Sequence, residues 1–387
     1  MKIETGDVSM TGSATTFRAK TQTLPSIPSN AHRIVLMRHG ESEFNNANIV
    51  SVPVKTSKEW KVLLSSSSIL TYPISSLTYF QFTGWCDVAL TQRGVVEAVE
   101  AGQVFASHEI SFRKCYTSLL TRSVITAQRS LEAAGISYTP LQYDWRLNER
   151  HYGAFQGLSK EQTVARLGRD KVQKYRRGFT TKPPTMTVEH PHYDLINNDA
   201  RYRNLKGIPL GESLQDCQIR VVAAFEDIRR DIQTMNNVQV ESDYSLIVAH
   251  NNTLRALVMH LDDIPVDDIE GLSIPTAIPF YYDVDKTTGR VVSSSDTTAD
   301  QDASDKIGAG LFRGIYISDE RKKTSFLERR RAANDPWRWA LHDHQVTESM
   351  LVSDDDENNE TIEREAMASI VKQAKQNTEL FTTKQYY

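Results

Sequence analysis

Two histidines stand directly after apolar segments of the kind that form buried strands. His39 follows residues 33–37 within an Arg-His-Gly-Glu sequence, and His250 follows residues 244–249. A neutral imidazole is a competent nucleophile toward phosphorus. A lone Arg-His-Gly is a weak signal, because a histidine at such a place more often has a structural role. The hypothesis of phosphoryl transfer therefore depends on the residues between the two histidines.

Those residues include the other groups that this chemistry requires. Arg38, Arg122 and His250 can surround the three equatorial oxygens of a transferring phosphoryl group. Phosphoryl transfer needs mainly positioning and charge stabilisation, so a cage of cations is the expected device. Glu149 can protonate the leaving hydroxyl group and deprotonate the accepting one.

A second set of cations lies further along the chain. Lys160, Arg176 and Arg177 suit another anionic group, either a carboxylate or a phosphate. The alternative is that Arg176 and Arg177 form a solvated helix face. That alternative would leave the second charge of the substrate without a partner.

Strands alternate with helices around these residues. Apolar runs predict strands at residues 33–37, 114–118, 244–249 and 280–284, the last of which closes the pattern. Helical spacing predicts helices after Thr91, at 119–134, 221–235 and 253–261. This order predicts an α/β fold, a three-layer α/β/α arrangement around a mostly parallel sheet. Both histidines then lie at carboxyl ends of strands, where such sheets bind ligands.

Longer segments carry a resemblance to a known family. From about residue 33 to about 284 the chain resembles the cofactor-dependent phosphoglycerate mutases of the histidine phosphatase superfamily. The resemblance is carried by LMRHGESEFN, FTGWCDVALTQRG, YTSLLTRS, RLNERHYGAFQGL, YRRGF, ESL, VAHNNTLRAL and IPTAIPFYYDVD. The segments NERHYGAFQGL and YRRGF distinguish the mutase branch from other members.

The resemblance implies a role for each matching residue. His39 would be the phosphorylated nucleophile and Glu149 the acid and base. The phosphate pocket would consist of Arg38, Arg122 and His250 with Asn45 and Asn252 beside it. The remaining substrate contacts would come from Tyr152, Lys160, Arg176 and Arg177, and from Thr83 and Gly84 in the substrate loop. Relatives interconvert 3-phosphoglycerate and 2-phosphoglycerate in glycolysis and gluconeogenesis, are primed by 2,3-bisphosphoglycerate and use no metal.

One residue departs from the family pattern beside the second histidine. Relatives usually carry glycine where this chain has Asn251. The position should present a backbone N–H to phosphate, and asparagine tolerates left-handed geometry better than most residues. We therefore expect Asn251 to be tolerated as part of the substrate site.

An insertion at residues 50–81 separates two motifs that are nearly adjacent in relatives. It begins with Val50 and ends with Gln81, whose codons can carry the GT and AG of intron borders. One hypothesis is that this segment is a translated intron that the mature protein lacks. The alternative is a genuine surface loop, whose closure entropy grows only logarithmically with length. Either way, the site requires Asn45 and Thr83 to stay close together.

The two ends of the chain differ from residues 31–290, the expected catalytic domain. Residues 1–30 are rich in serine and threonine and read as a disordered leader or a transit peptide. Residues 291–387 alternate basic and acidic runs, which indicates a charged and partly disordered extension. By resemblance, its segment 360–375 is a candidate lid over the active site.

Composition limits the remaining possibilities. The formal net charge of −4 gives no sign of a nucleic-acid or membrane partner, and no apolar run is long enough for a membrane span. Three widely spaced cysteines form neither a disulfide framework nor a metal cluster. A cytoplasmic location is expected, or a plastid or mitochondrion if the leader is a transit peptide. Relatives occur as monomers, homodimers and homotetramers.

Three further histidines are expected to have no part in the chemistry. The sequence assigns His151 a structural or surface role. It places His190 and His192, which follow two prolines, in a surface loop.

Overall fold

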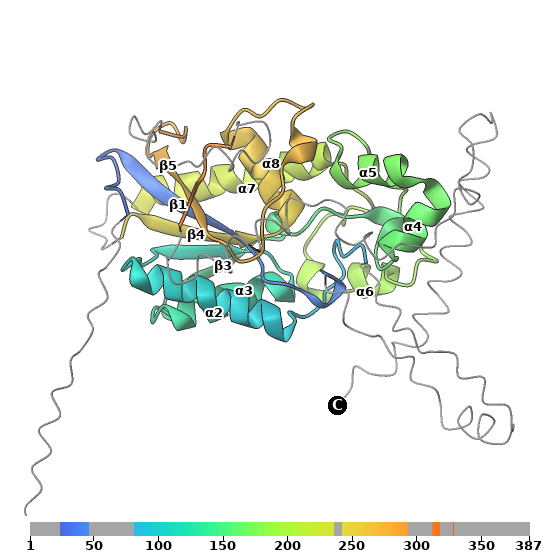
Figure 1. Cartoon of the computed structure of the whole chain (residues 1–387), viewed down its shortest axis with the longest axis horizontal. Helices are drawn as coiled ribbons and strands as arrows, with labels where there is room; N and C mark the ends of the chain where they lie inside the picture. The colour runs from blue at the N-terminus through green and yellow to red at the C-terminus, as the bar shows by residue number, and fades with distance from the viewer. Residues whose placement is uncertain (1–23, 46–80, 236–241, 293–311, 318–327, 329–387) are drawn as a thin grey trace, which may run out of the picture.

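A six-stranded sheet forms the centre of the molecule (Figure 1). The computed structural model describes residues 24–45, 81–235, 242–292, 312–317 and 328. The strand order is β3-β2-β4-β1-β5-β6. Strands β3, β2, β4 and β1 are parallel, whereas β5 runs antiparallel to both β1 and β6. The strands are β1 (Ala31–Arg38), β2 (Lys114–Thr117), β3 (Leu141–Tyr143), β4 (Tyr244–Ala249), β5 (Phe280–Asp285) and β6 (Ile315–Tyr316).

Helices cover both faces of the sheet, so the α/β/α prediction is confirmed. Helices α2 (Gln92–Ser107) and α3 (Thr121–Ala133) lie on one face, and α7 (Leu214–Met235) and α8 (Asn251–Leu261) lie on the other (Figure 1). Thr91 caps α2 as expected, because its side chain accepts a hydrogen bond from the Gly94 backbone N–H. Capping of this kind satisfies one of the unpaired amides of a helix start.

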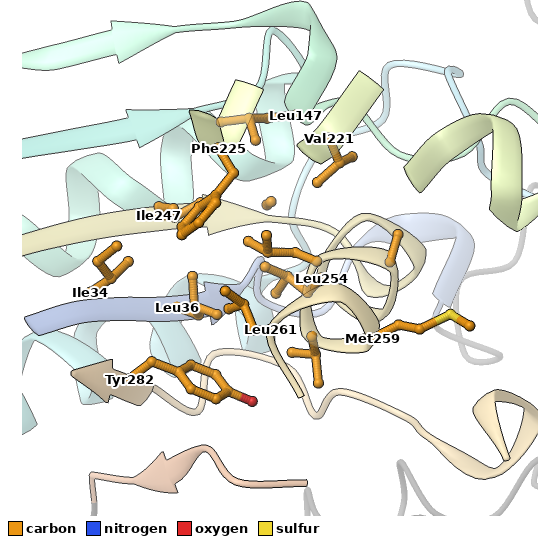
Figure 2. Packing of buried hydrophobic residues seen from close by; sticks show 14 of the residues in the cluster. Ile34, Leu36, Leu147, Val221, Phe225, Ile247, Leu254, Met259, Leu261 and Tyr282 are labelled. Carbon is orange, nitrogen blue, oxygen red and sulfur yellow. The ribbon is translucent and has the colours of Figure 1, made fainter. Parts of the chain in front are cut away.

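Alternation along the strands creates two apolar layers. On β1, Ile34 and Leu36 face α7 and α8, whereas Val35 and Met37 face α2 and α3. Neighbouring residues of a strand point to opposite faces, so a strand buried on both sides reads as continuously apolar. Figure 2 shows the first layer, in which Ile247 of β4 and Phe225 of α7 pack close to these side chains. Apolar side chains therefore pack against both faces of the sheet.

A group of short helices lies beyond the carboxyl ends of the strands, and the sequence patterns did not predict it. It comprises α4 (Lys160–Leu167), α5 (Arg169–Arg177) and α6 (Tyr193–Asn197). These helices pack on small apolar clusters of their own. Phe82 and Phe155 belong to one of them, and Trp85 and Tyr202 to another. Figure 1 shows these helices at the end of the sheet opposite the N-terminus of β1.

The chain contributes to the sheet beyond residue 290, although the strand at 280–284 was expected to be the last and the domain was expected to span residues 31–290. Strand β5 is not the last strand, because β6 pairs with it and Ile317 is fully buried. The Arg313 side chain bonds to Asp262 at the end of α8 and fastens this segment. The domain therefore includes residues 312–317. Helix α7 also begins at Leu214, earlier than the 221–235 that spacing predicted.

The surface loop expected around His190 is present, because residues 187–189 are exposed and lie outside helices and strands, but His190 itself is not at the surface. The His190 side chain is buried, and its Nε2 lies 3.2 Å from the backbone oxygen of Ala154. His151 is buried and structural, as expected, with its Nδ1 accepting a hydrogen bond from the Gly153 N–H. Polar side chains of this kind become interior when a neighbouring loop supplies their partners.

Several expectations fall outside the described residues. These are most of the leader, almost the entire insertion and the candidate lid at 360–375. The two sides of the insertion are nevertheless adjacent in the structure. The Gln81 N–H donates to the backbone oxygen of Phe44 over 3.2 Å. The chain therefore leaves and rejoins the domain at almost the same point.

Candidate active site

His39 lies at the carboxyl end of β1 and is almost completely buried. Its backbone N–H donates to the Ala249 oxygen at the end of β4, over 2.9 Å. Its Nδ1 lies 2.7 Å from the Gly40 carbonyl oxygen. A carbonyl only accepts, so we assign the ring proton to Nδ1. Burial, reinforced by Arg122 and Arg38, holds the pKa of His39 well below its usual value. The imidazole is therefore neutral, and Nε2 has a free lone pair.

His250 begins the turn from β4 into α8 and lies beside His39. The two ring centroids are 5.0 Å apart. His250 is fully buried, and burial followed by the charge of Arg122 lowers its pKa well below the usual value. Among the described residues, its Nδ1 forms no hydrogen bond. Two neutral imidazoles thus meet where two parallel strands end.

Arg122 is the cation whose charge acts most strongly on both rings. It is 1% exposed, and it donates to the backbone oxygens of Cys86 and Gly84 over 2.9 and 2.8 Å. Gly84 has a φ of +49°, and a Cβ there would lie 2.2 Å from the Gln156 amide oxygen. Glycine is required at this position because a side chain would be both strained and obstructed. The backbone oxygen of Gly84 therefore helps to orient Arg122.

Arg38 reaches the site from the last residue of β1. It donates from Nη1 to the backbone oxygen of Ile274 over 2.9 Å. Its own backbone oxygen accepts from the Ala277 N–H over 2.9 Å. The loop before β5 therefore holds this arginine at two points.

Glu149 is fixed by backbone amides. Its Oε1 accepts from the Arg150 N–H over 2.8 Å and from the Asn252 N–H over 3.1 Å. Asn252 is the second residue of α8, and a helix N-terminus favours a carboxylate. The carboxylate also acts on Arg122, whose pKa is lowered by burial and raised in part by Glu149. Glu149 is therefore electrostatically coupled to the buried Arg122 guanidinium.

The second set of cations comes from the two helices beyond the sheet. Lys160 begins α4, and Arg176 and Arg177 end α5. Burial and then Arg176 lower the pKa of Lys160 well below its usual value. Burial and then Arg177 lower the pKa of Arg176 to about 9. Arg177 is 8% exposed, so the solvated helix face is wrong. Mutually repelling, recessed cations are stabilised when an anion binds among them.

Asn252 and Tyr152 connect the two sets of charges. The Asn252 amide donates to the Tyr152 hydroxyl over 3.0 Å, and its oxygen accepts from Arg255 over 2.7 Å. The Arg150 guanidinium lies 4.6 Å from the centre of the Tyr152 ring. Arg150 is fully buried, and its Nε and Nη1 form no hydrogen bond within the described ranges. Sequence reasoning missed Arg150 and Arg255, although Arg150 directly follows Glu149.

The sequence of this chain is similar to a known family and to curated proteins. A family model described as histidine phosphatase superfamily (branch 1) matches residues 77–297. A curated protein of Mycobacterium tuberculosis is 39% identical over 257 residues, 66% of this chain and 87% of its own length. One of Rhodococcus opacus is 39% identical over 254 residues, 65% of this chain and 85% of its own. Both are named 2,3-bisphosphoglycerate-dependent phosphoglycerate mutase.

The chain belongs to the histidine phosphatase superfamily. The match to the family model begins at residue 77, near the end of the insertion at 50–81, and therefore does not include His39. Among solved structures, a mycobacterial glucosyl-3-phosphoglycerate phosphatase is similar at a TM-score of 0.45 and 20% identity, covering 67% of this chain and 95% of its own. A likeness of this size does not bear on the reaction.

Asn45 and Thr83, the two remaining expected site residues of this superfamily member, have contacts within their own loops. The Asn45 amide donates to the Ser42 hydroxyl over 3.0 Å. The Thr83 backbone oxygen accepts from the Cys86 N–H over 2.9 Å. Their roles toward a substrate stay predictions.

The explanation given for Asn251 is wrong. Asn251 is the first residue of α8, and it is absent from the few described non-glycine residues with positive φ. Its side chain instead accepts a hydrogen bond from the Ile274 N–H over 3.0 Å. The same Ile274 peptide carries the oxygen that holds Arg38. In this superfamily member, asparagine therefore supports the arginine of the first motif.

No three histidine, cysteine or acidic side chains among the described residues are grouped so as to hold a metal ion. No helix in the same part of the chain is both long and apolar enough to cross a membrane.

Proposed function

We propose that the protein is a 2,3-bisphosphoglycerate-dependent phosphoglycerate mutase that interconverts 3-phosphoglycerate and 2-phosphoglycerate in glycolysis and gluconeogenesis. The observation that carries the proposal is the combination of one neutral, nucleophilic imidazole with two sets of cations. Arg38 and Arg122 accompany the nucleophile His39, and Arg176 and Arg177 lie with Lys160, on which Arg38 also acts. A substrate with a phosphate and a second anionic group fits both.

The buried donors support binding of a bisphosphorylated molecule. Nε of Arg122, two guanidinium nitrogens of Arg150 and Nδ1 of His250 form no hydrogen bond among the described residues. Buried polar groups are normally paired, so these atoms fit the oxygens of an anionic ligand. 2,3-Bisphosphoglycerate would supply the phosphoryl group that charges the enzyme.

Two phosphoryl transfers follow, one onto His39 and one from His39 to the accepting hydroxyl. The Nε2 lone pair of His39 attacks phosphorus while the bond to the leaving oxygen breaks, and protonated Glu149 gives that oxygen its proton. Arg38, Arg122 and His250 stabilise the charge on the equatorial oxygens. In the return step, Glu149 removes the proton from the accepting hydroxyl. That oxygen attacks phosphorus, and His39 leaves as a neutral imidazole. General acid–base catalysis of this kind is worth about 10²- to 10⁴-fold in rate.

An enolase-coupled assay on 3-phosphoglycerate tests the proposal. We expect 2-phosphoglycerate to form only after priming with 2,3-bisphosphoglycerate, with little release of inorganic phosphate. Glu149→Gln keeps an Oε1 acceptor for both backbone amides, so it should lower kcat by about 10²- to 10⁴-fold without unfolding the protein.

Glu132→Gln is the matched control, since Glu132 is an exposed residue of α3 that pairs with Arg129. Its kcat should equal that of the wild type. Phosphate release at the rate of substrate consumption would instead identify a phosphatase and refute the proposal.

A further inference from the structure

Ser118 contacts one of the two ring nitrogens of His250. It directly follows β2 and is fully buried. Its hydroxyl oxygen lies 2.8 Å from Nε2 of His250. The same oxygen accepts a hydrogen bond from the Leu120 backbone N–H over 3.1 Å. One lone pair of the hydroxyl is therefore already used, and the hydroxyl proton remains available to the histidine.

The other ring nitrogen of His250 is the atom left for a ligand. Nε2 is occupied by Ser118, and Nδ1 is buried with no hydrogen bond to any described residue. After burial itself, Arg122 and then His39, Arg220 and Arg38 act on this ring, and each of them lowers its pKa. Because the imidazole is neutral, one nitrogen carries a proton and the other a lone pair.

Two arrangements of the ring proton are possible, and they differ in what the pocket receives. With the proton on Nε2, the ring donates to Ser118 and presents a lone pair at Nδ1, which repels a phosphoryl oxygen. With the proton on Nδ1, the ring accepts from Ser118 and presents a donor to that oxygen. A donor aimed at developing negative charge is what phosphoryl transfer uses.

We propose that Ser118 is a positioning residue that donates its hydroxyl proton to Nε2 of His250 and thereby holds the His250 proton on Nδ1. This rests on the proposed function only in giving the donor a phosphoryl group to bind. The two adjacent histidines are then held in the same tautomer by different partners. Gly40 makes His39 present a lone pair, and Ser118 makes His250 present an N–H.

Nitrogen NMR of the free enzyme at pH 8, labelled with ¹⁵N-histidine, measures the tautomer directly. The resonances of His250 are identified by their loss in His250→Asn. We expect the wild type to carry the proton on Nδ1. Ser118→Ala should move the population toward the Nε2 tautomer. It should weaken binding of inorganic phosphate about tenfold, because fewer molecules then carry the Nδ1 N–H that donates to the charged phosphate. Ser118→Thr, which keeps the hydroxyl, should restore both.

Ser123→Ala is the matched control. Ser123 is equally buried, and its hydroxyl bonds to Thr117 and to the Val248 backbone oxygen, without touching a histidine. It should lower thermal stability but leave the His250 tautomer and phosphate affinity unchanged. A wild-type proton on Nε2 would overturn the proposal, as would an unchanged tautomer in Ser118→Ala. Equal effects of Ser118→Ala and Ser123→Ala would also overturn it. None of these readouts requires mutase activity, so failure of the proposed function would be seen separately.

Discussion

Arg220 is a buried side chain that helps to hold the turn carrying Glu149. It lies on α7, is 7% exposed and forms two hydrogen bonds with the buried Glu212 carboxylate, over 2.7 and 2.8 Å. Its remaining donors reach the backbone oxygens of Arg146, Asn148 and Glu149, over 2.7, 2.9 and 3.0 Å. One guanidinium thus holds the whole turn that carries the proposed acid and base.

Arg220→Met removes all five hydrogen bonds at similar side-chain length. Within the part of the chain that the structure describes, Glu212 would keep one donor, the His151 N–H, and would stay buried. Breaking a buried ion pair from one side costs about 3–5 kcal/mol. That is a large part of a total stability of about 5–15 kcal/mol. At about 2–4 °C per kcal/mol for a domain of this size, the melting temperature should fall by roughly 6–20 °C.

Urea unfolding and a thermal melt measure this effect, with Arg129→Met as the control. Arg129 forms an ion pair with Glu132 on the surface of α3, where both side chains are at least half exposed. Such pairs contribute about 0–1 kcal/mol, so the control should unfold like the wild type. If Arg220→Met lost less than about 1 kcal/mol, the turn would be held by other contacts and the reasoning would be refuted.

Three further predictions concern pH, the insertion and Asn251. Burial lowers the pKa of His32 and His190 to about 4, below the unfolded value of about 6.5, so their contribution to stability is complete above pH 6.5 and is lost as the pH falls toward 4. Over that range each residue lowers the unfolding free energy by about 1.4 kcal/mol per pH unit. A urea midpoint that is equal at pH 7 and pH 5 would contradict this prediction. Deletion of residues 50–81 should keep kcat and the melting temperature close to those of the full chain, because Phe44 and Gln81 already meet; an unfolded deletion variant would argue for a genuine structural loop. Asn251→Gly leaves the Ile274 N–H without its acceptor, so we expect the unfolding free energy to fall by about 1–3 kcal/mol. A variant as stable as the wild type would show that water replaces the side chain.

Local signals predicted the parts of the fold that depend on local physics. The strand at residues 244–249 was predicted with its exact bounds of β4, because six apolar or small residues in a row fit only a buried strand there. Thr91 was predicted as a cap because its bond to Gly94 spans three residues. Strands β3 and β6 were missed, since two or three residues show no periodicity and their existence depends on pairing with β2 and β5.

In the candidate site, too, residues that follow local patterns were predicted and residues held by long-range contacts were not. Residue type and chain position were enough to propose His39 and His250, because both follow strands whose carboxyl ends meet in an α/β sheet. Arg122 and Glu149 were proposed for the charge and the proton transfer that the chemistry needs, and neither lies at a strand end. The residues that orient them are held by contacts across the fold, such as Ser118 with His250 or Arg220 with the Glu149 turn.

Asn251 shows why sequence reasoning failed for such contacts. A local rule about left-handed backbone was applied to a residue whose backbone is helical. What gives the asparagine a role is its hydrogen bond to Ile274, 23 residues further along the chain, and through that peptide to Arg38. A glycine there would keep the backbone amide and lose that connection. The departure from the family pattern is therefore evidence about how this chain holds its first arginine, and the stability of Asn251→Gly measures it.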